Sequence, residues 1–399
     1  MWYSQEGLRR KGNDRAGVFL VMRIMITGGG TGGHVSPAVA ILEELQRRDP
    51  RLIVQWVGRR GGIEEGVCQN LAVPFRALPV EGWPRGKSLR RVWTAMKLGV
   101  SIAQSAVYLR QFRPQLVLGV GGYVSLPLMY AAQRINAPTV IHEQNRLLGM
   151  ANRLLAPRAR RIFLSYPVTI GPYPKDRAVI AGNPVRAGFI SPPSRTEARA
   201  ALNLANDIPV LLICGGSQGA HSINAAVAEA LPLFPDGSVQ VLWMTGKADL
   251  AMARAAASTA AVRVEVFAYI QEMPRACAAA DLLAGRAGAS STAEVAVLGK
   301  PSILIPFPHA ADNHQEQNAR AFEEAGASVL LLDKDLTGKR LYETVQRLLA
   351  DPAALGAMGE AARRLAKPYA AETIAEEILA IVFGQARAME REAAPNDAP

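Results

Sequence analysis

The sequence predicts an α/β protein with two Rossmann-like domains, each a doubly wound parallel sheet, that face each other across a cleft. Its 399 residues suffice for two domains that each bury a full core. Short apolar runs alternate with helical stretches, as in βαβ units. A glycine-rich loop also follows an apolar run twice, in RIMITGGGTGGH at 23–34 and in VLLICGGSQGAH at 210–221. Such loops bring the N–H groups of a helix N-terminus close to a phosphate, so a pair of them predicts two nucleotide-type half-sites.

The predicted strands occur in two groups. The first group is RIMIT, IVQWVG, QLVLGV, PTVIHE and RIFLS, with helices such as AVAILEELQRR between them. Prolines then interrupt regular structure in AGNPVRAGFISPPSR, and the second group is VLLICGG, QVLWMTG, VRVEVFAY, DLLAGRAG and PSILIPF. We therefore predict an extension at 1–21 with Met22 as an alternative start, an N-terminal domain at 22–183, a C-terminal domain at 184–369, a helix at 370–384 that packs back on the N-terminal domain, and a frayed polar tail at 385–399.

Composition indicates an ordered globular protein, with 49% hydrophobic and 20% charged residues. Lysine and arginine number 45 against 34 acidic residues, and the net charge of +11 favours anionic partners. No acidic residue occurs from Gly82 to His142, where eight basic residues lie: Arg85, Lys87, Arg90, Arg91, Lys97, Arg110, Arg113 and Arg134. Apolar residues such as Trp83 and Trp93 alternate with them, which suits an anionic membrane surface and equally suits positions that face a core.

Three isolated cysteines, Cys68, Cys214 and Cys277, predict free thiols in a reducing compartment. No signal peptide is convincing. The uncharged stretch Pro114–Gln133 is long enough to span a membrane, but Gly121, Gly122 and Pro127 interrupt it. A strand, a loop and a new helix are the better prediction for it.

The first glycine loop also fits the dinucleotide pattern through Gly28, Gly30 and Gly33. A NAD site would need a carboxylate at the end of the next strand, where Arg59 and Arg60 stand. The missing carboxylate counts against NAD, while NADP stays a minor alternative because the arginines could hold its 2′-phosphate. His34 follows the loop, and it is either a base for an acceptor hydroxyl or only a residue that begins a helix. The segment HEQN at 142–145 either faces the cleft or forms a turn of side-chain hydrogen bonds.

In the second half, Arg186 can reach a diphosphate from between the domains or form a surface ion pair. Glu294 lies in the helix after the turn GRAGASSTAE and can accept from a sugar diol or be a solvated charge. Gln315 and Asn318 lie one helical turn apart and can contact sugar hydroxyls or belong to a polar helix face. No cluster typical of a protein-held catalytic metal occurs in the sequence, and no cofactor is expected.

Taken in order, the motifs GGGTGGH, GGYVS, HEQN, GNPVR, GGSQGA, the RAGA turn with Glu294, PF-P and HQ-x-x-NA resemble the MurG family, glycosyltransferase family 28. The resemblance runs from about Met22 to the C-terminal helix. It implies a GT-B fold and an inverting hexosyltransferase that moves N-acetylglucosamine (GlcNAc) from UDP-GlcNAc to the C4 hydroxyl of lipid I. The product is lipid II, a precursor of peptidoglycan in the cell wall. It also implies a peripheral protein on the cytoplasmic face of the membrane.

Carried over residue by residue, the resemblance assigns His34 as the candidate base. It assigns donor binding to Thr31, Gly32, Gly33, Asn145, Arg186, Ser217, Ile270, Ala289, Ser290, Ser291, Thr292, Ala293, Glu294 and Gln315. Within this set, the backbone of Ile270 would meet the uracil edge and Glu294 would hold the ribose hydroxyls. Leu126 stands where the family often has glycine, and Ala287 where it often has serine, so the walls of the pocket can differ.

Two rival functions stay open at this point. A UDP-GlcNAc epimerase on the same fold would need no lipid acceptor, so the basic and aromatic stretch counts against it. A non-catalytic module that binds a membrane or another anion would explain the net charge, but it leaves the glycine loops and Glu294 unexplained. Nucleic acid is not an expected partner, because the sequence contains no nucleic-acid-binding motif.

Overall fold

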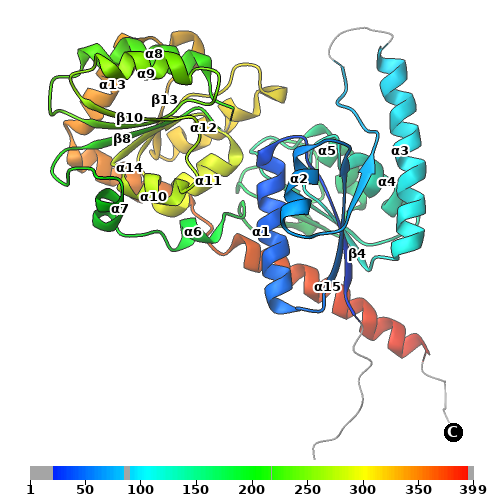
Figure 1. Cartoon of the computed structure of the whole chain (residues 1–399). Coiled ribbons are helices and arrows are strands. Elements are labelled where there is room, and N and C mark those ends of the chain that lie inside the picture. Colours follow the sequence, from blue (N-terminus) through cyan, green and yellow to red (C-terminus); the bar gives the residue numbers. More distant parts are fainter. Residues whose placement is uncertain (1–20, 85–89, 217, 394–399) are drawn as a thin grey trace, which may run out of the picture.

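The computed structural model describes residues 21–84, 90–216 and 218–393, and it confirms two α/β domains, each built on a parallel sheet (Figure 1). The first sheet has the strand order β3-β2-β1-β4-β5-β6-β7. Its strands are β1 (Arg23–Thr27), β2 (Ile53–Arg59), β3 (Phe75–Leu78), β4 (Leu116–Gly119), β5 (Thr139–Glu143), β6 (Arg161–Leu164) and β7 (Ala178–Ile180). The helices of this domain are α1 (Gly32–Arg48), α2 (Ile63–Asn70), α3 (Arg90–Phe112), α4 (Leu126–Arg134) and α5 (Met150–Leu155).

The second sheet repeats this arrangement with the order β10-β9-β8-β11-β12-β13. Its strands are β8 (Val210–Cys214), β9 (Gln240–Met244), β10 (Arg263–Phe267), β11 (Leu282–Gly285), β12 (Ser302–Leu304) and β13 (Ser328–Leu330). Its helices are α6 (Ala187–Ile190), α7 (Arg195–Ala201), α8 (His221–Ala230), α9 (Leu250–Ser258), α10 (Met273–Ala279), α11 (Ala289–Leu298), α12 (His314–Glu324), α13 (Gly338–Leu349) and α14 (Pro352–Leu365). In both sheets the glycine loop follows the strand at which the order reverses, which is where such folds bind ligands.

The last helix, α15 (Ala370–Ala393), returns the chain to the N-terminal domain. Ile374, Ala375, Ile378 and Val382 are buried in one core with Ile24 and Ile41 of β1 and α1. Figure 1 shows α15 running from the C-terminal domain past the C-terminal end of α1. The helix continues to Ala393, nine residues into the segment that we expected to be a frayed tail.

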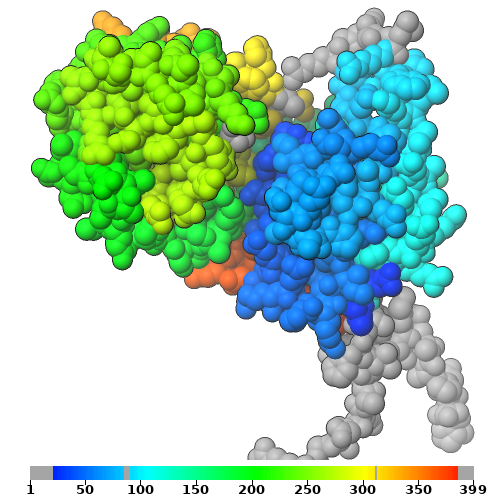
Figure 2. Space-filling model, in the orientation of Figure 1, coloured from blue at the N-terminus to red at the C-terminus, as the bar shows by residue number. Residues whose placement is uncertain are grey.

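The stretch Pro114–Gln133 forms β4, a loop and all but the last residue of α4, as its glycines and proline indicate. Within the described residues, no helix is both long enough and apolar enough to cross a membrane. The three cysteines are free thiols. Space-filling atoms show the C-terminal domain lying against the α1 side of the N-terminal domain (Figure 2).

The N-terminal half of helix α3 carries apolar side chains on the outside, whereas Leu109 and Phe112 near its C-terminus are buried. Trp93, Met96 and Val100 are each more than half exposed, whereas Thr94 and Ser101 on the opposite face are buried. This distribution is the reverse of an ordinary surface helix, whose apolar stripe faces the core. The alternative that Trp83, Trp93 and Met96 face the core is therefore wrong.

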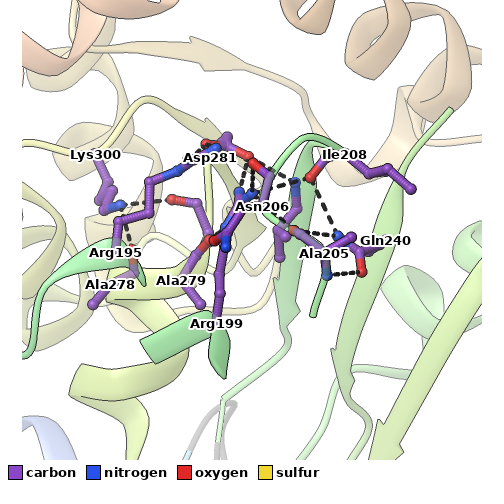
Figure 3. A network of polar contacts seen from close by, with 12 residues as sticks. Arg195, Arg199, Ala205, Asn206, Ile208, Gln240, Ala278, Ala279, Asp281 and Lys300 are labelled. Atoms are coloured by element: carbon purple, nitrogen blue, oxygen red, sulfur yellow. Dashed lines mark hydrogen bonds and ion pairs between the residues drawn. The ribbon is translucent and has the colours of Figure 1, made fainter. Parts of the chain in front are cut away.

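A buried arginine fastens the far end of the second sheet. Arg199 is fully buried and donates to the carbonyl oxygens of Ala279, Ala205, Asn206 and Ile208, and to the Asp281 carboxylate at 2.5 Å (Figure 3). The same carboxylate accepts from the Val210 N–H at 2.7 Å. The buried charge of Arg199 is tolerated because Nε, Nη1 and Nη2 each donate to a carbonyl or carboxylate oxygen. The network holds together the starts of β8 and β11, whose opposite ends carry the glycine loop and the RAGA turn.

Candidate active site

The first glycine loop joins β1 to α1 and packs against the end of β4. A Cβ at Gly28, where φ is +147°, would lie 2.2 Å from Cγ2 of Val120, so only glycine fits there. Thr31 and Gly32 are exposed, and Gly33 and His34 are half-buried. The loop therefore presents the start of α1 to solvent between the domains.

A buried carboxylate supports the first glycine loop through hydrogen bonds to the backbone. Glu64 of α2 is fully buried and accepts from the N–H groups of Gly30 at 3.2 Å and Arg59 at 2.8 Å. A Cβ at Gly29 would lie 2.3 Å from the Glu64 carboxyl carbon, so the brace needs glycine at that position. Sequence reasoning missed Glu64, because a glutamate in a short helix has no local signature of such a role.

His34 stands at the first turn of α1, with its Nδ1 2.9 Å from the Thr31 hydroxyl oxygen. Burial lowers the pKa of His34 to about 4, and the nearby imidazole of His314 on α12 lowers it further, while the Gly29 carbonyl opposes both effects. The ring is therefore neutral near pH 7 and has a lone pair that can take a proton.

The first three residues of the HEQN segment are buried within the N-terminal domain. Nε2 of His142 lies 3.0 Å from the Gly182 carbonyl oxygen, and Glu143 accepts from the Gly149 N–H and the Asn152 amide, each at 2.9 Å. The structure therefore favours a turn of side-chain hydrogen bonds for this part of the segment. Asn145 alone reaches the other domain.

The second glycine loop joins β8 to α8. Gly219 has φ +81°, and a Cβ there would lie 2.1 Å from the Thr245 carbonyl oxygen, which again requires glycine. His221 begins α8, and its Nδ1 lies 2.9 Å from the carboxylate of Asp249, which also accepts from Asn224 at 2.8 Å. Ser217, assigned to donor binding by resemblance, lies outside the described residues.

Two of the residues predicted to bind the sugar donor form an ion pair with each other. Nη2 of Arg186 lies 3.4 Å from Oε1 of Glu294, whose side chain is 17% exposed. Burial raises the pKa of Glu294 to about 7, and Arg186 opposes that rise. The pair joins the crossover between the domains to α11, so the carboxylate and the guanidinium lie where one ligand can contact both.

The first two turns of α11 contain the predicted run Ala289–Glu294. Within the described part of the chain, the hydroxyl of Ser290 is buried and has no hydrogen-bond partner. The Thr292 hydroxyl lies 3.2 Å from that of Tyr166 in the N-terminal domain, while Ser291 is exposed and Ala293 half-buried. Because α11 packs against α1, this turn lies close to the helix that carries His34.

The Ile270 backbone and the Gln315 side chain each have a hydrogen-bond partner within the C-terminal domain. The Ile270 N–H donates to Sδ of Met244 at 3.3 Å, beside a pocket of about 220 Å³ that Phe267, Tyr269 and Gln271 also line. Gln315 accepts from the Phe307 N–H at 3.0 Å through its side-chain oxygen.

Asn318, in contrast, bridges the domains. It accepts from the Arg146 N–H at 3.0 Å and donates to the Asn145 side chain and the Ala287 carbonyl, each at 3.2 Å. Arg146 also makes a two-pronged ion pair with Glu324, at 3.0 and 2.8 Å. Asn318 is fully buried, so its amide does not serve as the freely exposed sugar ligand that its helix face indicated.

Comparison with known proteins assigns this two-domain arrangement to a family. The model of the glycosyltransferase family 28 N-terminal domain matches residues 24–164, and that of the C-terminal domain matches residues 210–374. The chain belongs to glycosyltransferase family 28. It is thus an enzyme of the hexosyltransferase class, as the resemblance implied.

Relatives of this family 28 chain match it over nearly its whole length. A Syntrophus aciditrophicus protein named as the UDP-N-acetylglucosamine:N-acetylmuramyl-(pentapeptide) pyrophosphoryl-undecaprenol N-acetylglucosamine transferase is 40% identical, over 91% of this chain and 99% of its own. A Geobacter sulfurreducens protein of the same name is 40% identical, over 90% and 98%. The crystal structure of Acinetobacter baumannii MurG superposes with a TM-score of 0.74 at 28% identity, over 90% and 99%. A UDP-GlcNAc 2-epimerase from Neisseria meningitidis shares the fold, with a TM-score of 0.62 at 15% identity, over 90% and 100%.

Proposed function

We propose that this enzyme transfers GlcNAc from UDP-GlcNAc to the C4 hydroxyl of lipid I, with inversion at the anomeric carbon, and forms lipid II. The observation that carries the proposal is the pairing of the two half-sites. His34, neutral at the first loop, stands on the helix against which α11 packs with Glu294 and Arg186. The full-length relatives named for this transfer support it.

The donor side of the site would hold the nucleotide through complementary groups. Glu294 would accept hydrogen bonds from the ribose hydroxyls, and Arg186, released from its ion pair with Glu294, would turn to the diphosphate. The N–H groups of the second glycine loop, with Ser217 by resemblance, would offset the charge that develops on the departing UDP. Ile270 would meet the uracil edge once its N–H leaves the Met244 sulfur.

The acceptor side would use His34 as a general base. An in-line attack at the anomeric carbon needs the acceptor hydroxyl to lose its proton as the new bond forms. A neutral imidazole at the mouth of the first loop meets that need, and the Thr31 hydroxyl marks where an acceptor hydroxyl can approach Nδ1.

The lipid part of the acceptor would be reached through α3, with the enzyme peripheral on the cytoplasmic face of the membrane. Trp93 and Met96 are more than half exposed on its outer face, and Trp93 also stacks under Lys97, whose Nζ lies 5.4 Å from the ring centroid. Aromatic rings and basic side chains together suit the headgroup level of an anionic membrane. Arg85 and Lys87, which belong to the same basic stretch, lie outside the described residues.

The test is release of UDP from UDP-GlcNAc with and without a lipid I analogue. We expect release that depends on the acceptor and a disaccharide product with a β-linked GlcNAc. An epimerase would convert UDP-GlcNAc to its C2 epimer without any acceptor, and a non-catalytic module would leave the nucleotide sugar unchanged. Either of these results would refute the proposal.

A further inference from the structure

A chain of buried hydrogen bonds leads from the Gly182 carbonyl, before the crossover between the domains, through His142 to Gln144, whose side chain lies near the ring of His34. Gln144 is 1% exposed, and its Nε2 donates to the Val120 carbonyl oxygen at 2.8 Å and lies 3.0 Å from Nδ1 of His142. Because a carbonyl oxygen only accepts, the group facing Val120 must be the NH₂ of Gln144. His142 must then accept at Nδ1 and donate from Nε2 to the Gly182 carbonyl, 3.0 Å away.

This arrangement fixes the direction of the remaining atom, the side-chain oxygen of Gln144. Within the described residues, Oε1 is buried and has no hydrogen-bond partner. A Cβ built on Gly121 would lie 3.5 Å from this oxygen and 3.3 Å from Cδ2 of His34. The oxygen and the ring edge are therefore on the same side of Gly121, at most 6.8 Å apart, the sum of those two distances.

The orphaned oxygen needs a positive or hydrogen-bearing group to face. A buried acceptor without a partner is costly, and such an atom in a native protein calls for an explanation: local strain, a bound water or ion, or a catalytic role. The charged or titratable groups that act on His34 are His314 of α12 and the neutral His142 of β5, while the carboxylates of Glu64 and Glu143 are occupied by backbone and amide donors. The Gln144 oxygen is thus a buried, unpaired negative end near the ring. The Asn152 amide lies near the same point, where its Nδ2 donates to Glu143 and to the His142 carbonyl and its Oδ1 is likewise unpaired within the described residues.

We propose that Gln144 is a positioning residue for His34, whose carbonyl oxygen stabilises the imidazolium that forms when the ring takes the acceptor's proton. The proposal rests on His34 being the base in the proposed function. The negative end of a fixed dipole in a buried setting favours the charged ring, directly or through one bridging water. His142 and the Gly182 carbonyl keep that dipole in place.

The experiment compares Gln144→Met and Gln144→Glu with the wild type. Methionine removes the dipole at similar volume. Glutamic acid, kept protonated by burial, can donate to Val120 and still turn an oxygen toward His34. We expect the pKa of His34, followed by NMR of the ligand-free protein, to fall by about 0.5–1 in Gln144→Met and to stay level or rise in Gln144→Glu. We also expect kcat to fall about fivefold to tenfold in Gln144→Met, at unchanged KM for UDP-GlcNAc, and less in Gln144→Glu.

Gln133→Met is the matched control, because Gln133 is also buried in the N-terminal domain and donates to the Thr139 hydroxyl and the Leu155 carbonyl. It should lower the melting temperature without moving the pKa of His34 or kcat. The NMR titration needs no substrate, so it separates this proposal from the identity of the base, which His34→Ala tests. The proposal is overturned if folded Gln144→Met keeps the wild-type pKa of His34, or if Gln133→Met lowers that pKa and kcat as much as Gln144→Met does. If Gln144→Met does not fold, the Gln144→Glu variant decides: a fall in the pKa of His34 in that variant overturns the proposal.

Discussion

Glu294→Gln is expected to weaken the binding of UDP and UDP-GlcNAc and to remove the dependence of that binding on pH. The pKa of Glu294 is raised to about 7 by burial, so the carboxyl group is about half ionised near neutrality. Two ribose hydroxyls donate best to the ionised form, so binding favours loss of the proton. With a pKa of about 7, the ionised fraction rises about tenfold between pH 6 and pH 8, and the affinity for UDP should rise by about the same factor.

The loss in the variant can be scaled from the bonds removed. A hydrogen bond to a charged group is worth roughly 1.5–3 kcal/mol, which corresponds to about a tenfold to hundredfold increase in the KM for UDP-GlcNAc at pH 8. Calorimetric titration with UDP from pH 6 to pH 8 measures both effects. Glu265→Gln is the control, because Glu265 lies on β10 at the edge of the same sheet, paired with Arg263. An unchanged donor KM in Glu294→Gln, or a pH dependence that survives in it, would refute the assignment.

Three further outcomes follow from the site and its supports. His34→Ala should lower kcat by about 10²–10⁴-fold while UDP still binds normally by calorimetry, and a near-normal kcat would reduce His34 to a positional role. Arg199→Met should lower the free energy of unfolding by about 3–5 kcal/mol in urea titrations, because it leaves buried acceptors without a donor, yet the folded variant should keep its donor KM. Replacing Arg85, Lys87, Arg90 and Arg91 by glutamine should reduce sedimentation with anionic liposomes and activity on membrane-embedded acceptor, but not turnover of a soluble analogue; equal liposome binding would contradict it.

The fold was predictable because its signals are local. Each long strand is an apolar run of about five residues, and each glycine loop follows the strand at the reversal of sheet order. The short strands β3, β7 and β13 were missed, since three or four half-buried residues give too little periodicity to stand out. The extent of α15 was underestimated, because the polar residues after Phe383 continue the helix without any apolar stripe to mark it.

The site was predictable in its parts and less so in its connections. The proximity of Glu294 and Arg186 agrees with their assignment to one ligand, and the ion pair that the sequence analysis allowed for Arg186 has Glu294 as its partner, which was not foreseen. The braces were invisible, because Glu64 acts on a loop 34 residues away and Asn318 acts on Arg146 at a separation of 172 residues. Such pairs exist only once the chain has folded, and neither partner has a sequence context that sets it apart from ordinary polar residues.

The return of α15 to the N-terminal domain has a consequence for synthesis. Ribosomes extend the chain from its N-terminus, so β1 and α1 emerge long before the helix that covers Ile24 and Ile41. Until Ile374 and Ile378 arrive, one apolar face of the nascent first domain stays uncovered, whereas the second domain has all of its strands and helices as soon as α14 is complete. The domain made first would therefore be finished last, and during that interval it would be the part of the molecule that most needs a chaperone.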